Sequence, residues 1–142
     1  MPLTEGAPAP DFTLPADDGR IIQLSALKGS PVVVYFYPKD DTPGCTLEAI
    51  DFTRLASVFA ASGARIIGIS PDSVEDHCAF RDKYGLAVTL AADADKTVAN
   101  AYGVWVEKLN HGRATMGIER TTVLIDAAGR IARVWRKVKV DG

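Results

Sequence analysis

Cys45 is the residue of this sequence best placed to do chemistry, because it follows a strand-like run and opens a helix-like segment. The dipole and the unpaired N–H groups of a helix N-terminus favour an anion, so this position favours the thiolate form of a cysteine. Pro43 and Gly44 allow the backbone to turn tightly and to approach a ligand closely. Helix geometry alone leaves two interpretations open, a reactive thiolate and a small buried apolar residue.

Helical spacing places Cys45 on one face with other residues. Positions 45, 48, 52, 55 and 59 lie three or four residues apart, and Phe52, Leu55 and Phe59 make this face apolar. We therefore predict that the face is buried and that the Cys45 sulfur points toward the protein body. Glu48 lies on the same face, where a carboxylate is costly to bury unless it is paired. A partly exposed carboxylate, favoured by the helix dipole, is the alternative for Glu48.

Other polar residues carry less information. Asp40 and Asp41 are expected to face solvent, since anions close to Cys45 would disfavour a thiolate. His77 and Cys78 are adjacent in a predicted helix and point about 100° apart, which makes them a poor metal pair. The chain has no CxxC pair, which argues against a thioredoxin-type disulfide oxidoreductase, and it has no Gly-rich phosphate loop. No metal or cofactor is expected.

The elements that must position Cys45 follow from residue periodicity. Continuous apolar runs at 32–37 (VVVYFY) and 65–70 (RIIGIS) predict buried strands, and the helix between them (46–61) completes a right-handed βαβ crossover. The sequence also predicts extended pieces at 12–14 and 21–24, helices at 74–84 and 96–102, and a terminal hairpin from 121–126 and 131–136. This pattern predicts an α/β fold of the thioredoxin-like type, a mixed sheet sandwiched by helices in a single domain over residues 1–142.

Composition excludes several classes of function. The 142 residues carry a net charge of −2, which argues against a nucleic-acid-binding surface because that needs a basic excess. No apolar run approaches the roughly 18 residues that span a bilayer, so no membrane association is expected. The N-terminus lacks the basic and apolar segments of a signal peptide, and two cysteines are typical of reduced intracellular thiols. A cytoplasmic location is therefore expected.

Several segments resemble one protein family. YPKDDTPGCTLEA at 37–49 is similar to the active-site segment of peroxiredoxins of the bacterioferritin comigratory protein, or PrxQ, subgroup. Four more segments resemble the family in the same order: APDFTLPADDG at 9–19, SPDSVEDHCAF at 70–80, YGVWVEK at 102–108 and GIERTTVLID at 117–126. The resemblance implies the thioredoxin-like peroxiredoxin fold. It also implies a thiol peroxidase that reduces hydrogen peroxide and organic hydroperoxides, is recycled by thioredoxin or a similar dithiol donor, and serves antioxidant defence and redox homeostasis.

The resemblance assigns roles to individual residues. Cys45 would be the peroxidatic nucleophile that becomes a sulfenic acid, and Thr42 would bind the peroxide through its hydroxyl. Arg120 would bring a permanent cation to the sulfur, Pro38 would shield the sulfur, and Glu48 would orient the arginine. Taken singly, each residue is better explained without catalysis: Thr42 as a turn hydroxyl, Pro38 as the end of a strand and Arg120 as a solvated charge beside Glu119. Their spacing around Cys45 favours the active-site interpretation.

The chain departs from its relatives at the second cysteine. Many PrxQ proteins carry it five residues after the first, where this chain has Ile50, and others carry it at the position of Arg81. Cys78 lies one helical turn before Arg81, and we favour it slightly as the resolving residue that would form a disulfide with Cys45. The alternatives are a plain helix residue and a one-cysteine cycle in which an external thiol attacks the sulfenic acid.

Two other classes of function stay open at this point. A cysteine hydrolase would use Cys45 activated by His77 or by His111, which is expected in an exposed turn, but Thr42 has no role in such an enzyme. In a non-catalytic thioredoxin-fold interaction protein, Cys45 would only pack. PrxQ relatives are often monomers, so a monomer is expected by analogy. They usually continue into a final helix after a segment like KVKVDG at 137–142, so we expect a C-terminal tail that is either truncated or disordered.

Overall fold

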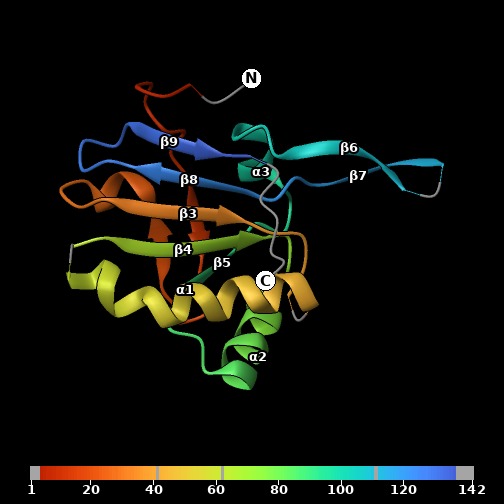
Figure 1. Cartoon of the computed structure of the whole chain (residues 1–142), viewed down its shortest axis with the longest axis horizontal. Coiled ribbons are helices and arrows are strands. Elements are labelled where there is room, and N and C mark those ends of the chain that lie inside the picture. Colours follow the sequence, from red (N-terminus) through yellow and green to blue (C-terminus); the bar gives the residue numbers. More distant parts are fainter. Residues whose placement is uncertain (1–3, 41, 62, 111, 137–142) are drawn as a thin grey trace.

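The computed structural model describes residues 4–40, 42–61, 63–110 and 112–136. A five-stranded mixed sheet runs through it in the order β5-β4-β3-β8-β9 (Figure 1). Its strands are β3 (Val32–Phe36), β4 (Arg65–Ser70), β5 (Thr89–Ala92), β8 (Thr121–Ile125) and β9 (Ile131–Trp135). The segment 137–142, to which the expectation about the C-terminal tail refers, lies outside the described residues.

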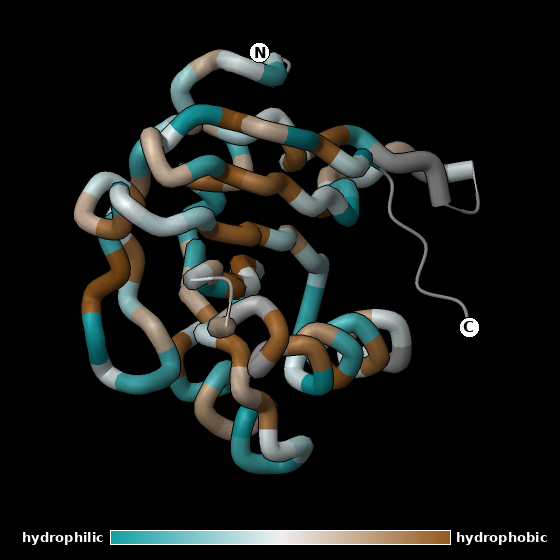
Figure 2. The backbone as a smooth tube through the Cα atoms, turned by 60° about the vertical axis from the view of Figure 1, so that its left-hand side comes forward, coloured by the Kyte–Doolittle hydropathy of each residue, from teal (hydrophilic) through white to brown (hydrophobic). Residues whose placement is uncertain are grey.

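The central strand β3 explains the continuous apolar run of the sequence. Every residue of β3 is buried, because helices and a hairpin cover both faces of the sheet (Figure 2). On one side β3 pairs in parallel with β4, so that Val33 lies beside Ile66. On the other side it pairs antiparallel with β8, with Val33 beside Leu124. Strands β8 and β9 pair antiparallel with each other. The predicted βαβ crossover and the predicted terminal hairpin are therefore confirmed.

Two layers cover the sheet. Helices α1 (Pro43–Ala61) and α2 (Val74–Tyr84) lie together on one face, and α2 has the bounds that the sequence predicts. Ser73 caps α2 by accepting a hydrogen bond of 3.1 Å from the backbone N–H of Asp76, and Gly85 ends the helix with φ of 62°. The opposite face carries α3 (Thr97–Ala101), the 3₁₀ helix η1 (Leu24–Leu27) and the hairpin of β1 (Thr13–Pro15) with β2 (Ile21–Gln23).

The periodicity of the sequence misses three strands. One is the edge strand β5, and the others are β6 (Trp105–Asn110) and β7 (Arg113–Ile118), which form a hairpin that extends away from the sheet (Figure 1). Much of this hairpin is exposed, so its residues do not show the apolar alternation of a half-buried strand. Among the described residues, no helix is long and apolar enough to cross a membrane.

The apolar face of α1 is narrower than predicted. Phe52 packs on the core and stacks on Tyr35 with ring centroids 4.6 Å apart. Leu55 is 43% exposed, so the prediction of a buried Leu55 is wrong. At 100° per residue, Leu55 is turned by about 80° from Cys45 around the helix, and it leaves the face that meets the sheet. The side chain of Phe59 lies outside the described residues.

Candidate active site

Cys45 lies in the first turn of α1, next to the carboxyl end of β3. The chain leaves β3 at Phe36, crosses the end of the sheet and enters α1 at Pro43. The Cys45 side chain is 1% exposed and belongs to an apolar cluster with Tyr35, Tyr37 and Ala49. Its sulfur therefore points toward the protein body, as the helical spacing predicts.

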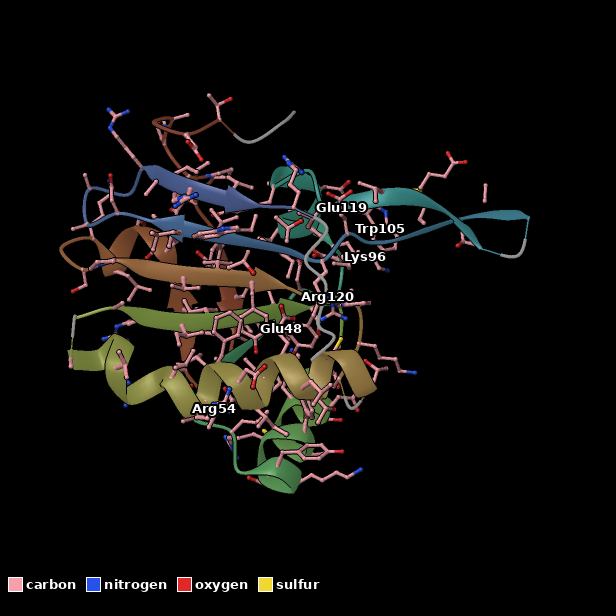
Figure 3. All side chains as sticks on the ribbon, viewed as in Figure 1. Glu48, Arg54, Lys96, Trp105, Glu119 and Arg120 are labelled. Atoms are coloured by element: carbon pink, nitrogen blue, oxygen red, sulfur yellow. The ribbon has the colours of Figure 1, made fainter. Side chains whose placement is uncertain are left out.

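Arg120 joins Cys45 and Glu48 into one cluster. Thr121 lies opposite Phe36 in the sheet, so Arg120 is level with the loop that leaves β3. Its Nη2 donates a hydrogen bond of 3.2 Å to the Cys45 sulfur, and its Nη1 donates one of 2.7 Å to Oε1 of Glu48. Figure 3 labels Arg120 and Glu48. Glu48 is buried and paired, which excludes the alternative of a partly exposed carboxylate. The two ends of the guanidinium thus bind a sulfur and a carboxylate at once.

Burial and charge act in opposite directions on this cluster. Burial raises the pKa of Glu48, because it disfavours the carboxylate, and the ion pair with Arg120 offsets only part of the shift. Burial would lower the pKa of Arg120, but its interactions with Cys45 and Glu48 outweigh that effect and raise it. Arg120 is therefore a permanent cation beside the Cys45 sulfur.

Gly44 makes room for this contact. A β-carbon at position 44 would lie 3.3 Å from Nη2 of Arg120, the same nitrogen that binds the Cys45 sulfur. Any side chain there would press on the guanidinium. The glycine therefore allows the close approach of the Arg120 side chain. The predicted close approach to a ligand stays a prediction.

Thr42 and Pro38 flank Cys45 in different ways. Thr42 lies directly before α1, and its hydroxyl donates a hydrogen bond of 2.9 Å to the carbonyl oxygen of Lys39. Because that bond uses the hydroxyl hydrogen, the oxygen keeps its capacity to accept. Pro38 is exposed just beyond the end of β3, and a shielding role for it stays a prediction.

Asp40 does not face solvent, and this expectation is wrong. The residue is 8% exposed, and its Oδ1 accepts a hydrogen bond of 2.6 Å from the Tyr37 hydroxyl. Its Oδ2 shares a hydrogen bond of 2.6 Å with Nδ1 of His77. These partners satisfy the carboxylate inside the protein, which the sequence pattern does not reveal. Asp41 and His111 lie outside the described residues.

Asp40, Asp72 and His77 have the residue types and the mutual distances of a metal-binding site. Single atoms of Asp40, Asp72 and His77 lie within 4.8 Å of one another. The hydrogen bonds of the protein engage Oδ2 of Asp40, Oδ2 of Asp72 and Nδ1 of His77.

Cys78 is not brought to the site. Its thiol donates a hydrogen bond of 3.1 Å to the carbonyl oxygen of Asp17, in the turn between β1 and β2. Nη1 of Arg81 binds the same oxygen at 2.9 Å and the Asp17 carboxylate at 3.1 Å. Both cysteines are free thiols in this structure. Cys78 and Arg81 thus attach α2 to the turn between β1 and β2, which lies beside the edge strand β5.

The raised pKa of Glu48 predicts how stability depends on pH. The folded protein holds the Glu48 proton more tightly than the unfolded chain, so the free energy of unfolding falls as the pH rises through the window between the two pKa values. Glu48→Gln removes this titration, and the wild type should lose stability relative to the variant as the pH rises from about 4.5 toward neutrality. Urea unfolding at several pH values measures the difference, with Asp51→Asn as a control for losing an exposed carboxylate of α1. Parallel curves for wild type and Glu48→Gln would contradict the prediction.

Comparison with known proteins gives consistent matches over the whole chain. The model of the AhpC/TSA family matches residues 6–134. A relative named putative peroxiredoxin bcp, from Coxiella burnetii, is 52% identical over 142 residues, which cover 100% of this chain and 94% of the relative. A solved structure of Xylella fastidiosa PrxQ has a TM-score of 0.93 at 34% identity and covers 100% of this chain and 91% of that one. The structure of the Xanthomonas campestris bacterioferritin comigratory protein has a TM-score of 0.90 at 40% identity, with 96% and 90% covered.

These matches confirm the thioredoxin-like fold and the resemblance drawn from the segment around Cys45. They leave the roles of the single site residues as predictions. The chain belongs to the AhpC/TSA family, among the peroxiredoxins of the Bcp/PrxQ subgroup.

Proposed function

We propose that this protein is a thiol-dependent peroxidase in which the Cys45 thiolate reduces hydrogen peroxide and organic hydroperoxides. Membership of the peroxiredoxin family supports the activity. The Xanthomonas campestris relative is described for its alkyl peroxide reduction activity, which supports organic hydroperoxides as substrates. The single observation that carries the assignment of the nucleophile is the hydrogen bond of 3.2 Å from Arg120 to the buried sulfur.

The chemistry follows from the cluster. The Cys45 thiolate attacks one oxygen of the peroxide, the O–O bond breaks, and a sulfenic acid forms while the other oxygen leaves and takes up a proton. Arg120 stabilises the thiolate and the negative charge that develops on the leaving oxygen. Thr42 accepts a hydrogen bond from the peroxide O–H, and the backbone N–H of Cys45 has no partner within the helix and donates to the substrate. Glu48 holds the guanidinium in place.

A peroxide-consumption assay tests this function. The protein should consume peroxide catalytically with a dithiol donor such as reduced thioredoxin, and only about one equivalent per Cys45 without it. A cysteine hydrolase or a non-catalytic interaction protein would show no consumption that depends on the dithiol. The hydrolase is also disfavoured because His77 is fully buried and bonded to Asp40 rather than to Cys45.

We propose that an external dithiol, thioredoxin or a donor like it, reduces the oxidised Cys45. The sequence favours Cys78 slightly as an internal resolving thiol. A disulfide needs Cα atoms within roughly 7 Å, and the Cys78 thiol is bound to Asp17 instead, beside the Asp17–Arg81 contacts. Joining Cys78 to Cys45 would require α2 to release these contacts, which supports the one-cysteine alternative.

Peptide mapping of the oxidised protein decides between the two cycles. After one equivalent of peroxide, the expected product is a sulfenic acid or a further oxidised Cys45, with Cys78 still a free thiol. Cys78→Ser should therefore leave turnover with dithiol within about twofold of the wild type, since the external thiol attacks Cys45 directly. A peptide in which Cys45 is linked to Cys78, together with loss of turnover in Cys78→Ser, would establish Cys78 as the resolving residue.

We also propose a monomer that acts in the cytoplasm. The low cysteine count and the ordinary charge balance of the sequence support this location. Light scattering coupled to size-exclusion chromatography tests the monomeric state, and a mass twice that of the chain would overturn it.

Fractionation of the native host tests the cytoplasmic location, and recovery of the protein outside the cytoplasmic fraction would overturn it.

A further inference from the structure

Three buried polar side chains meet at the carboxyl ends of the parallel strands, and we refer to Tyr37, Asp40 and His77 as the Asp40 cluster. The Tyr37 hydroxyl donates a hydrogen bond of 2.6 Å to Oδ1 of Asp40. Oδ2 of Asp40 lies 2.6 Å from Nδ1 of His77, and Nε2 of His77 lies 3.1 Å from the carbonyl oxygen of Ala91. His77 is fully buried. The cluster thus ties the loop that precedes α1 to α2 and to β5.

The protons of the cluster can be assigned from its partners. A carbonyl oxygen only accepts, so Nε2 of His77 carries a hydrogen and donates it to Ala91. The contact between Nδ1 and Oδ2 needs one further proton, which either His77 or Asp40 carries. In both cases the pair has no net charge.

The backbone of Asp40 is anchored as well. Its N–H donates a hydrogen bond of 2.7 Å to Oδ2 of Asp72, and that oxygen also accepts one of 2.6 Å from the Ser70 hydroxyl at the end of β4. Pro38 and Lys39, which precede Asp40, are exposed. The loop between β3 and α1 is therefore fixed to the protein interior at Asp40, whereas Pro38 and Lys39 of the same loop are exposed to solvent.

Thr42 depends on this anchor. Its hydroxyl donates to the carbonyl oxygen of Lys39, the residue next to Asp40, so a shift of Asp40 moves the group that orients the hydroxyl. We propose, on the basis of the function proposed above, that Asp40 is a positioning residue for the peroxidase reaction. Through the Asp40 cluster it holds the Lys39 carbonyl, and that carbonyl turns the Thr42 oxygen so that it accepts from the peroxide.

A double-mutant cycle on the reaction of Cys45 with hydrogen peroxide tests the proposal. Stopped-flow measurement gives the second-order rate constant for the wild type, Asp40→Ala, Thr42→Val and the double variant. Asp40→Ala should slow the reaction about tenfold or more when Thr42 is present, since small displacements of a catalytic group carry large penalties. In the Thr42→Val background the same change should cost less than about twofold, because the group that Asp40 positions is gone.

A conservative change should restore the rate. In Asp40→Asn, the amide oxygen can accept from Tyr37 and the amide nitrogen can donate to Nδ1 of neutral His77. Its rate constant should therefore lie within about threefold of the wild type. A rate for Asp40→Asn as low as that of Asp40→Ala would overturn the proposal.

Asp93→Ala is a matched control for the loss of a buried carboxylate. Asp93 is buried and accepts from the N–H groups of Val98 and Ala99 at 3.2 and 2.8 Å, so its loss weakens the start of α3 rather than the loop before α1. Its rate constant should match the wild type. Equal slowing by Asp40→Ala in both Thr42 backgrounds, or equal slowing by Asp93→Ala, would show that Asp40 acts through general stability and would overturn the proposal.

Tyr37→Phe replaces Asp40→Ala in the cycle if that variant does not fold. It keeps the ring that stacks on Tyr35 and removes the hydroxyl, with its hydrogen bond to Oδ1 of Asp40 and its contact of 3.4 Å with Nδ1 of His77. The same non-additive pattern with Thr42→Val supports the proposal, and an unchanged rate overturns it. A wild type that does not react with peroxide would refute the proposed function itself, so the two failures are distinct.

Discussion

Cys45→Ser is expected to abolish peroxide consumption and to leave the fold intact. A serine hydroxyl is not ionised at neutral pH and cannot form a sulfenic acid, so the first step of the reaction has no nucleophile. The substitution removes little volume from a side chain that is 1% exposed, and the packing of α1 on β3 should persist. The rate of peroxide loss measures the first effect, and circular dichroism with thermal unfolding measures the second.

Cys78→Ser is the matched control for Cys45→Ser, since it removes the other thiol of the chain. Its reaction with the first equivalent of peroxide should be unchanged. Near-normal turnover in Cys45→Ser, or loss of the first reaction in Cys78→Ser, would show that Cys45 is not the nucleophile.

Arg120→Met should slow the reaction of Cys45 with peroxide by about 10²-fold or more. The change removes a cationic donor that lies 3.2 Å from the sulfur, and losing one such donor raises the barrier by about 2.7–4 kcal/mol in comparable oxyanion sites. Arg120→Lys keeps the charge but not the two-ended fork, so its rate should fall between those of the wild type and Arg120→Met. Stopped-flow measurement of the second-order rate constant gives all three values.

Arg120→Met also leaves Glu48 buried without its partner, which lowers stability for a separate reason. The double variant Arg120→Met/Glu48→Gln separates the two effects. It should recover much of the lost stability, because no carboxylate is left unpaired, and it should remain slow. A rate that returns with the stability would show that Arg120 is structural.

Buried elements were predictable where the sequence carries a local signal, such as a continuous apolar run or a pair of helix caps. The run at 32–37 has apolar residues at every position because β3 is covered on both faces, and the cap Ser73 and the end Gly85 mark α2 in the sequence itself. The hairpin of β6 and β7 carries no such signal, because pairing between its own strands rather than burial in the sheet holds it in place.

The site residues that lie a few positions apart on one helix could be placed together from the sequence. Contacts between residues far apart in the sequence could not. Helical spacing placed Cys45 and Glu48 on one side of α1, but only the pairing of β8 with β3 brings Arg120 to both. Asp40 was expected in solvent because an anion close to Cys45 would disfavour a thiolate. The sequence pattern did not show that His77, which lies 37 residues away on α2, is its buried partner. One signal was available, since His77 lies three residues before Phe80 and shares its buried face of α2.

The long separation between Cys45 and Arg120 has a consequence for a chain that is still being synthesised. The two residues are 75 positions apart, which a ribosome covers in about 4 to 15 s. During that interval the nascent cysteine has left the decoding centre while the arginine that would stabilise its thiolate has not yet been translated. If Arg120 stabilises the thiolate as proposed, the nascent thiol should reach its full reactivity only after β8 has been synthesised and has paired with β3. We therefore expect Cys45 to be oxidised more slowly in the nascent chain than in the folded protein.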